Sequence, residues 1–437
     1  MAVQQQIAAS SLGINLRACV AALGPPAILA AVLLALAPAA RAQNFTVLHT
    51  FSGPDGRAPV AGLVMDRAGN FYGTTIDGGR GNNGTVFRLS PRGSGWIFAP
   101  LYKFSGGSDG GGPEARVTIG PDGSLFGTTY AGGNQTCGFH SPCGVVFRLR
   151  PPATFCASIS CPWTETVLYS FNSTTSGNNP TAEVTFDQAG NLYGTTFYGA
   201  PGSDCVEGAC GVVFELSPSQ GEWTESVLHQ FTLDDGGLPW GAVIFDRAGN
   251  MYGVTYGGGS GGFGTAYKLS PSGNGWTEQV LHSFLYASDG EFPIGNLIFD
   301  TAGNLYGTTS GGPANSAAGT VFQLTPSNGN WTFATTFDLP GSGAGPESGL
   351  VMDAGGNFYG ATYGGGAYNQ GTVFKLSPSG AGWTYTSLHD FTGGPDGGVP
   401  YGPLILDASG NIYGTASRGG DLNDCPVGCG TVWEITR

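Results

Sequence analysis

Residues 297–309 read L-I-F-D-T-A-G-N-L-Y-G-T-T, and this stretch decides the fold. One apolar run ends at Asp300, and small residues then lead into a second run that starts at Leu305. Two such runs separated by Asp, Gly and Asn are typical of short strands joined by a tight turn. Asp caps a turn of this kind through its side chain, and Gly or Asn supplies positive φ. The stretch therefore predicts a β-hairpin.

The same phrase recurs seven times along the chain. Its aromatic residue marks each copy: Tyr72, Phe126, Tyr193, Tyr252, Tyr306, Tyr359 and Tyr413. Successive copies lie 53 to 67 residues apart, and the two widest intervals contain extra cysteines. A steady period of this length is the signature of a repeat architecture, in which insertions fall in loops.

Each unit carries four strand signals. They are an apolar run such as residues 243–245, the L-Y-G-T-T run, a G-T-V-F-x-L run such as residues 371–376, and a run that begins with Trp, such as residues 276–284. Four antiparallel strands repeated seven times predict an all-β protein, a seven-bladed β-propeller of four-stranded antiparallel blades.

The two ends of the repeat region complement each other. The last unit stops in its third strand, at residues 431–435, while residues 45–51 match a fourth strand. We therefore expect the N-terminal strand to complete the last blade, because a closed ring leaves only short protected strand edges.

The D-x-x-G-N-L-Y-G-T-T and G-T-V-F-K-L-S-P phrases resemble GloVer, a tandem-repeat family of exported bacterial proteins. The resemblance runs from Phe45 to Arg437. Members of that family often end in a sorting or anchor segment, whereas this chain ends in a predicted strand, so we expect no C-terminal anchor. The resemblance implies no catalytic residues. The D-x-x-G-N-[LI]-Y rhythm is also similar to that of other exported propellers, some of them lyases or lactonases, which is an analogy of fold alone.

Composition excludes several classes of protein. Aromatic residues make up 12% of the chain and charged residues 11%, and 78 residues are Gly. Disorder would require few aromatics and many charges, and collagen would require a strict Gly period. The formal net charge is −14, with only 16 Lys and Arg. We therefore expect no nucleic-acid partner and no binding to anionic membranes.

Residues 1–42 differ from the rest of the chain. A short apolar stretch, residues 27–37, precedes Ala40-Arg41-Ala42, an A-x-A cleavage pattern. We interpret residues 1–42 as a signal peptide and residues 43–437 as a single propeller domain, which is exported to the periplasm, the cell surface or the medium. The alternative is a retained anchor, but the apolar run is shorter than a spanning helix needs. No transmembrane segment is expected after signal removal.

Eight cysteines in the repeat region form four close pairs. They are Cys137 and Cys143, Cys156 and Cys161, Cys205 and Cys210, and Cys425 and Cys429. Close pairs also make zinc sites, but few histidines lie nearby and an exported chain favours oxidation. We expect four local disulfides, each of which stiffens one loop.

Four histidines recur at one place in the fourth strand. His49, His229, His282 and His389 occupy the position that Tyr102, Tyr169 and Phe337 take in other units. A position that accepts His, Tyr or Phe is selected for flat bulk, so we interpret these histidines as packing residues. The hairpin aspartates, such as Asp300, lack the several oxygen ligands of a calcium loop and are interpreted as turn caps.

A partial ring of acidic loops leads into the first strands. Its candidate ligand-binding residues are Asp55, Asp109, Asp235, Asp289 and Asp396, each followed by Gly. If the first strand is innermost, these loops share a face with the long cysteine-bearing loops, and longer variable loops tend to bind ligands. Trp240 and Tyr401 lie in two of these loops and could stack on a sugar ring. The site would bind a cation, such as Ca²⁺, or a sugar. The alternative is that each Asp-Gly pair only forms the turn and binds no ligand.

No motif for catalysis has its required context. Two G-x-S-x-G matches and one G-x-G-x-x-G match lack the helix that such sites need. We therefore expect a binding or scaffold module for an extracellular ligand, either a carbohydrate, another surface polymer or a protein. The alternatives are an extracellular lyase or hydrolase with carboxylates at the channel mouth, and a structural cell-surface protein.

Overall fold

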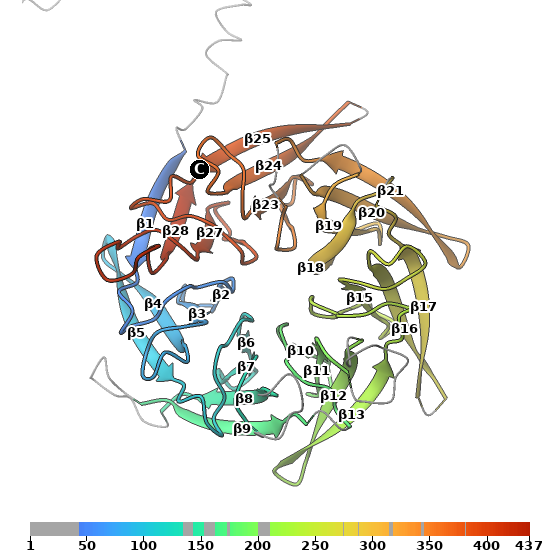
Figure 1. Cartoon of the computed structure of the whole chain (residues 1–437), viewed down its shortest axis with the longest axis horizontal. Coiled ribbons are helices and arrows are strands. Elements are labelled where there is room, and N and C mark those ends of the chain that lie inside the picture. The colour runs from blue at the N-terminus through green and yellow to red at the C-terminus, as the bar shows by residue number, and fades with distance from the viewer. Residues whose placement is uncertain are drawn as a thin grey trace, which may run out of the picture. The chain divides into compact units, whose positions relative to one another are not determined.

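The computed structural model describes residues 43–133, 143–152, 162–172, 175–199, 210–273, 275–286, 288–313, 318–341, 345–380 and 382–437. Their strands form seven four-stranded antiparallel sheets in a ring (Figure 1). No helix lies in these residues. The fold is the seven-bladed β-propeller that the repeats predict. Residues 1–42, and with them the predicted signal peptide, lie outside the described residues.

Each blade runs from a first strand beside the channel to a fourth strand at the rim. The first strands of blades 1 to 7 are β2 (Val64–Met65), β6 (Thr118–Ile119), β10 (Thr185–Phe186), β14 (Ile244–Phe245), β18 (Glu291–Phe299), β22 (Val351–Met352) and β26 (Ile405–Leu406). The second strands are β3 (Phe71–Thr75), β7 (Leu125–Thr129), β11 (Leu192–Thr196), β15 (Met251–Thr255), β19 (Leu305–Gly311), β23 (Phe358–Thr362) and β27 (Ile412–Ala416). The third strands are β4 (Thr85–Arg92), β8 (Val145–Arg150), β12 (Val212–Ser219), β16 (Thr265–Ser272), β20 (Thr320–Ser327), β24 (Thr372–Ser379) and β28 (Thr431–Thr436). The fourth strands are β5 (Gly95–Lys103), β9 (Thr164–Ser170), β13 (Glu222–Gln230), β17 (Gly275–Ser283), β21 (Asn330–Asp338), β25 (Gly382–Asp390) and, for blade 7, β1 (Asn44–Thr50).

The N-terminal strand closes the ring. Strand β1 pairs antiparallel with β28, with Phe45 opposite Ile435 and Val47 opposite Trp433. Figure 1 shows β1 beside β28 at the rim of the last blade. The closure predicted from the chain ends is confirmed.

The recurring phrase is explained by the hairpin between the first and second strands. In blade 5, Asp300 Oδ1 accepts hydrogen bonds from the backbone N–H groups of Ala302 (2.8 Å) and Asn304 (2.9 Å). Its Oδ2 accepts from the Asn304 side chain (2.7 Å) and from the Tyr306 hydroxyl (3.2 Å). Asp, Asn and Tyr therefore recur together in six of the seven blades, because one carboxylate holds the turn and anchors the next strand; in blade 2, Ser124 contacts Asp122 and Phe126 replaces the Tyr.

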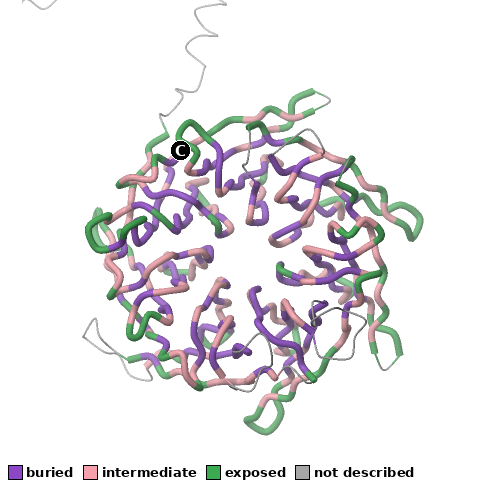
Figure 2. The backbone as a smooth tube through the Cα atoms, viewed as in Figure 1, coloured by how far each residue is buried: buried purple, intermediate pink, exposed green. Residues whose placement is uncertain are grey.

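The core is divided into layers between neighbouring blades. Each hydrophobic cluster combines residues of two adjacent blades, such as Phe171 of blade 2 with Phe214 of blade 3. Figure 2 shows the burial along the middle of each blade and the exposure of the outer hairpins. Within a blade, the Gly of L-Y-G-T-T lies under a third-strand ring: a Cβ on Gly307 would lie 2.4 Å from Phe322 Cζ. This contact excludes any side chain at that Gly.

Candidate functional site

Seven inner loops surround the mouth of the channel. We define an inner loop as a proline and the three residues that follow it, which come just before the first strand in six blades and lie within β18 in blade 5. The prolines are Pro59, Pro113, Pro180, Pro239, Pro293, Pro346 and Pro400. Each proline packs on a glycine of the preceding blade; for example, a Cβ on Gly264 would lie 2.6 Å from Pro293 Cδ. This contact anchors the start of every inner loop.

A second anchor holds the middle of most inner loops. The first Thr of L-Y-G-T-T donates a buried hydrogen bond to the carbonyl of the second residue after the proline in the next blade. Thr74 donates to Ala115 (3.0 Å), and Thr415 donates to Ala61 (2.8 Å). Because neither anchor uses the side chains on either side of the clamped residue, those side chains are free to vary.

The repeats diverge at those two side chains. The first residue after the proline is Val60, Glu114, Thr181, Trp240, Ile294, Glu347 or Tyr401 in blades 1 to 7. The third is Gly62, Arg116, Glu183, Ala242, Asn296, Gly349 or Pro403. The residue between them is small in every blade. The side chains around the channel therefore differ in chemistry from blade to blade at the first and third positions only.

All of these divergent residues except Ala242 and Ile294 line a cavity of about 250 Å³ at the channel mouth. Trp240 and Tyr401 are partly open, with exposed fractions of 37% and 36%. Both residues expected to stack on a ligand therefore lie at the cavity. The first strand is innermost, as that expectation required.

Three polar side chains from three blades bridge the channel. The Arg116 guanidinium donates to both carboxylate oxygens of Glu183, through Nε and through Nη2 (2.6 Å). The Asn296 side chain donates to the same carboxylate (2.8 Å). Arg116 also lines a second cavity of about 430 Å³ beside β18, β22 and β26. The bridge thus separates the mouth cavity from the other half of the channel.

Four polar groups of the mouth cavity lack partners among the described residues. Burial raises the pKa of Glu114 and of Glu347 to about 7, and no cation or hydrogen bond opposes it. The hydroxyl oxygens of Thr181 and Ser348 are buried without a hydrogen-bond partner, although both residues line the cavity. Thr181 and Ser348 are buried, and an unsatisfied buried polar group is costly, whereas Glu114 and Glu347 are partly exposed. All four groups are suited to contact a polar ligand.

Aromatic rings support the two open side chains. Trp240 lies edge-on to Phe197, with ring centroids 5.1 Å apart, and 5.8 Å from Tyr256. Tyr401 stacks on Tyr363 at 5.9 Å. The packing fixes the orientation of both rings, so each presents a rigid face to a ligand.

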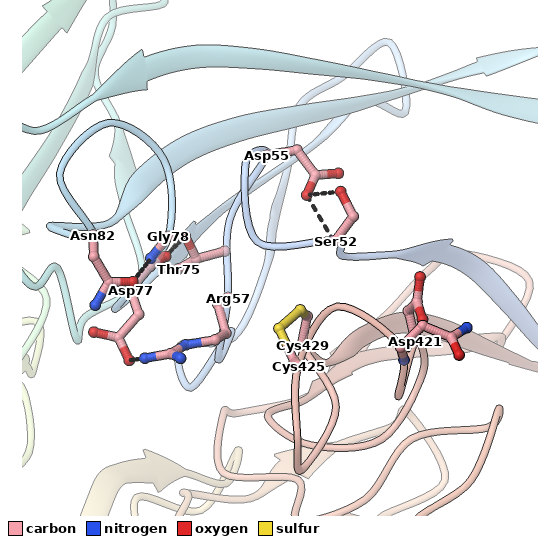
Figure 3. The surroundings of a disulfide bond; sticks show 11 residues. Ser52, Asp55, Arg57, Thr75, Asp77, Gly78, Asn82, Asp421, Cys425 and Cys429 are labelled. Carbon is pink, nitrogen blue, oxygen red and sulfur yellow. Dashed lines mark hydrogen bonds and ion pairs between the residues drawn. A yellow bond between two sulfur atoms is a disulfide. The ribbon is translucent and has the colours of Figure 1, made fainter.

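The five D-G aspartates lie elsewhere and do not line this cavity. Each contacts the flat side chain at the end of a fourth strand: Tyr102 holds Asp109 (3.0 Å), and histidines hold the others at 2.6 to 3.2 Å. Asp55 also accepts hydrogen bonds from the Ser52 backbone and hydroxyl (Figure 3). Burial by itself would raise the pKa of Asp55, but these contacts outweigh it and lower the pKa. The contacts are those of a loop cap, the alternative considered for D-G.

The recurring histidines also join neighbouring blades. His282 stacks on Phe333 of the next blade at 3.8 Å, and His49 stacks on Phe98 at 4.0 Å. Three blades carry a Glu at the position that Phe98 and Phe333 occupy in theirs. In each of these acids one carboxylate oxygen, Oε1, is buried without a hydrogen-bond partner; they are Glu165, Glu225 and Glu278. Burial raises the pKa of each to about 7.

Replacing one of these rim acids should stabilise the fold at high pH. The folded pKa of Glu225 lies above its ordinary value of 4.5, so its contribution to stability is complete below pH 4.5 and is lost as the pH rises through about 7. We expect Glu225→Gln to melt about 1–2 °C above the wild type at pH 8 and with no gain at pH 4.5. Thermal melts from pH 4.5 to 8.5 measure this; Glu222→Gln, at an exposed site on the same strand, is the control. A gain that does not vary with pH would contradict the burial of the charge.

The cysteine predictions are tested where residues are described. Cys425 and Cys429 form a disulfide with 5.4 Å between their Cα atoms (Figure 3). It is buried against Phe51 and Leu63, at the closure between blades 7 and 1. Cys143 and Cys210 are also disulfide-bonded, while Cys137, Cys156, Cys161 and Cys205 lie outside the described residues.

The described residues contain neither a cluster of metal-ligating side chains nor a membrane-spanning helix. Within the described ranges, no group of three or more His, Cys, Asp or Glu side chains is placed to hold a metal ion. No helix in that part of the chain is long and apolar enough to cross a membrane.

The sequence matches the model of the Gloeobacter/Verrucomicrobia repeat over residues 32–208 and 197–433. The chain belongs to this family. A comparison with curated protein sequences gives no match. The GloVer repeat identified from the two recurring phrases is thus confirmed as the family of this chain.

Solved structures share the fold of this GloVer chain. The extracellular domain of the hybrid two-component system BT4673 from B. thetaiotaomicron has a TM-score of 0.53 and 12% identity, over 89% of this chain and 39% of that one. PorZ, a surface component of the type-IX secretion system of Porphyromonas gingivalis, has a TM-score of 0.49 and 15% identity, over 90% and 48%. The chain spans less than half of either protein. At such identity, the first likeness shows the fold alone.

Sequence reasoning identified Trp240 and Tyr401 but missed most of the cavity. It overlooked Glu114, Arg116, Glu183, Asn296 and Glu347, which no short motif marks. The signal was nevertheless present: once the units are aligned on the proline, the first and third residues after it vary while their neighbours repeat. In that alignment Trp240 of blade 4 and Val60 of blade 1 occupy the same position, the first after the proline.

Proposed function

We propose that this propeller is an exported ligand-binding module that holds a carbohydrate unit of an extracellular polymer in the mouth cavity. The observation that carries the proposal is the divergence of otherwise repeated inner loops at the side chains that line the cavity. Packing alone would keep such positions alike, as it keeps the residues between them small.

The chemistry of the cavity suits a sugar. A pyranose ring offers an apolar face to an aromatic ring and hydroxyls at its edge. Trp240 and Tyr401 supply the aromatic faces, and Thr181, Ser348 and the two glutamates supply polar groups that lack partners. Pockets that combine apolar walls with a few convergent polar groups are characteristic ligand sites.

Export is supported by three observations. The A-x-A pattern at residues 40–42 is typical of signal cleavage. The BT4673 domain that shares the fold is extracellular. An oxidised pair, Cys425 and Cys429, fits the same setting.

Removing the indole of Trp240 should weaken binding. We expect Trp240→Ala to raise the Kd for a bound oligosaccharide by about tenfold or more, since truncation of a buried aromatic contact typically costs 1–2 kcal/mol. The assay is calorimetry with residues 43–437 and a panel of oligosaccharides, with EDTA and with Ca²⁺. Tyr368→Ala, at an exposed aromatic outside the cavity, is the matched control. Equal affinities in the wild type and Trp240→Ala would refute the site.

Turnover of the bound polymer is a second candidate function. Glu114 and Glu347 have pKa values near 7, which suits general acids or bases, and they face one cavity from different blades. The discriminating measurement is release of reducing or unsaturated ends during incubation with the polysaccharide that binds. Product formation that Glu114→Gln or Glu347→Gln abolishes would establish the enzyme; binding without product supports the module.

A further inference from the structure

The charges of the mouth cavity are unbalanced. Among the described residues, Arg116 is the only Lys, Arg or His that lines the cavity, and its guanidinium is engaged by Glu183. Arg418 acts electrostatically on Tyr401 but does not itself line the cavity. Glu114 and Glu347 therefore have no cation of the protein within this cavity. Their raised pKa values follow from the same imbalance, because burial removes water from each carboxylate and nothing replaces it.

The surroundings of these carboxylates also favour a positive group. Burial raises the pKa of the phenols of Tyr256 and Tyr401, and the negative charge of Glu347 raises both pKa values further. Glu347 thus lies near two aromatic rings. Carboxylates beside Trp and Tyr faces form the setting in which proteins hold ammonium groups, through ion pairs and cation–π contacts.

A metal ion does not fit the same groups. Ca²⁺ takes six to eight oxygen ligands in one shell, and within the described residues no group of three or more candidate side chains is so placed. An organic cation needs only one or two carboxylates and apolar walls. The cavity, about 250 Å³, accommodates a group of the size of a single sugar.

We infer that the mouth cavity selects a sugar that carries a free, positively charged amino group, with the ammonium paired to Glu114 or to Glu347 and the ring against Trp240 or Tyr401. This inference rests on the proposed carbohydrate-binding function and names the class of sugar. Thr181 and Ser348, whose hydroxyls lack partners, then face the ring hydroxyls.

The test compares two oligomers of the same length, one of glucosamine and one of N-acetylglucosamine, against residues 43–437. We expect the glucosamine oligomer to bind at least tenfold more tightly at pH 6.5, because acetylation removes the charge. Glu114→Gln or Glu347→Gln, whichever removes the carboxylate that holds the ammonium, should remove most of that preference, and the double Gln variant should remove it. Asp424→Asn, an exposed acid on a loop after β27, should leave it unchanged.

A permanently charged probe isolates the protein's own titration. Tetramethylammonium does not titrate, so its Kd should fall about tenfold between pH 5.5 and 8.5 as the two carboxylates ionise, and the double Gln variant should show no such change. Equal binding of both oligomers, with no pH dependence for the probe, would overturn the ammonium inference and leave the carbohydrate site standing. Absence of binding by every sugar would overturn both.

Discussion

Deletion of residues 43–50 should lower the melting temperature of the propeller by about 10 °C or more and make it self-associate. The deletion removes β1, so β28 loses its antiparallel partner and becomes an open edge. It also removes Phe45, which contacts His389, Phe391 and Trp433 across blades 6 and 7. An exposed, unpaired strand is a template for pairing with another chain.

Calorimetry and size-exclusion chromatography measure both effects, and deletion of Gln43 alone is the control. A synthetic peptide of residues 43–52 added in trans should restore part of the melting temperature, because it can occupy the vacant edge. A truncated protein that melts and elutes like the wild type would show that closure by β1 contributes little.

Gly307→Ala should cost about 1–3 kcal/mol, the usual penalty for overpacking a core. The new Cβ would lie 2.4 Å from Phe322 Cζ and 2.8 Å from Leu297 Cδ2, and Phe322 is fully buried and has no free space to move into. Because each core layer joins two blades, the strain is transmitted to blade 4 through the contacts of Phe322 with Phe284.

Chemical denaturation of four proteins tests the origin of this cost: the wild type, Gly307→Ala, Phe322→Leu and the double variant. The double variant should lose less stability than the sum of the single losses, since the shorter Leu side chain makes room for the methyl group. Gly275→Ala is the control, because no atom lies within 4 Å of its Cβ. Additive losses would show that the ring and the glycine do not interact.

The propeller was predictable because its local requirements repeat. A hairpin held by Asp, Asn and Tyr tolerates few substitutions, so each copy leaves the same letters, as in Asp300, Asn304 and Tyr306. Ring closure could be predicted from backbone hydrogen bonding. The last unit ends in its third strand, β28, which needs a partner, and residues 45–51 match a fourth strand that has no third strand before it.

The site was harder to predict because the role of a carboxylate depends on its neighbours in space. Asp55 and Glu114 are both acids in loops that lead to first strands, yet Asp55 is held by His49 and Ser52 while Glu114 faces a cavity without a partner. Only the fold distinguishes them. Trp240 was recognisable from the sequence because an indole at a loop tip has no turn-forming role, whereas a Glu there is inconspicuous.

The clamps on the inner loops separate the recognition chemistry of this molecule from its stability. The proline holds the start of every inner loop and the Thr hydrogen bond holds the middle of most of them, and neither anchor depends on the side chains that flank the clamped residue. The first and third residues after each proline can therefore be substituted to change ligand recognition while the ring stays folded. A library randomised only at the first and third residues after each proline would sample new specificities on an unchanged scaffold, much as the variable loops of an antibody do on their framework.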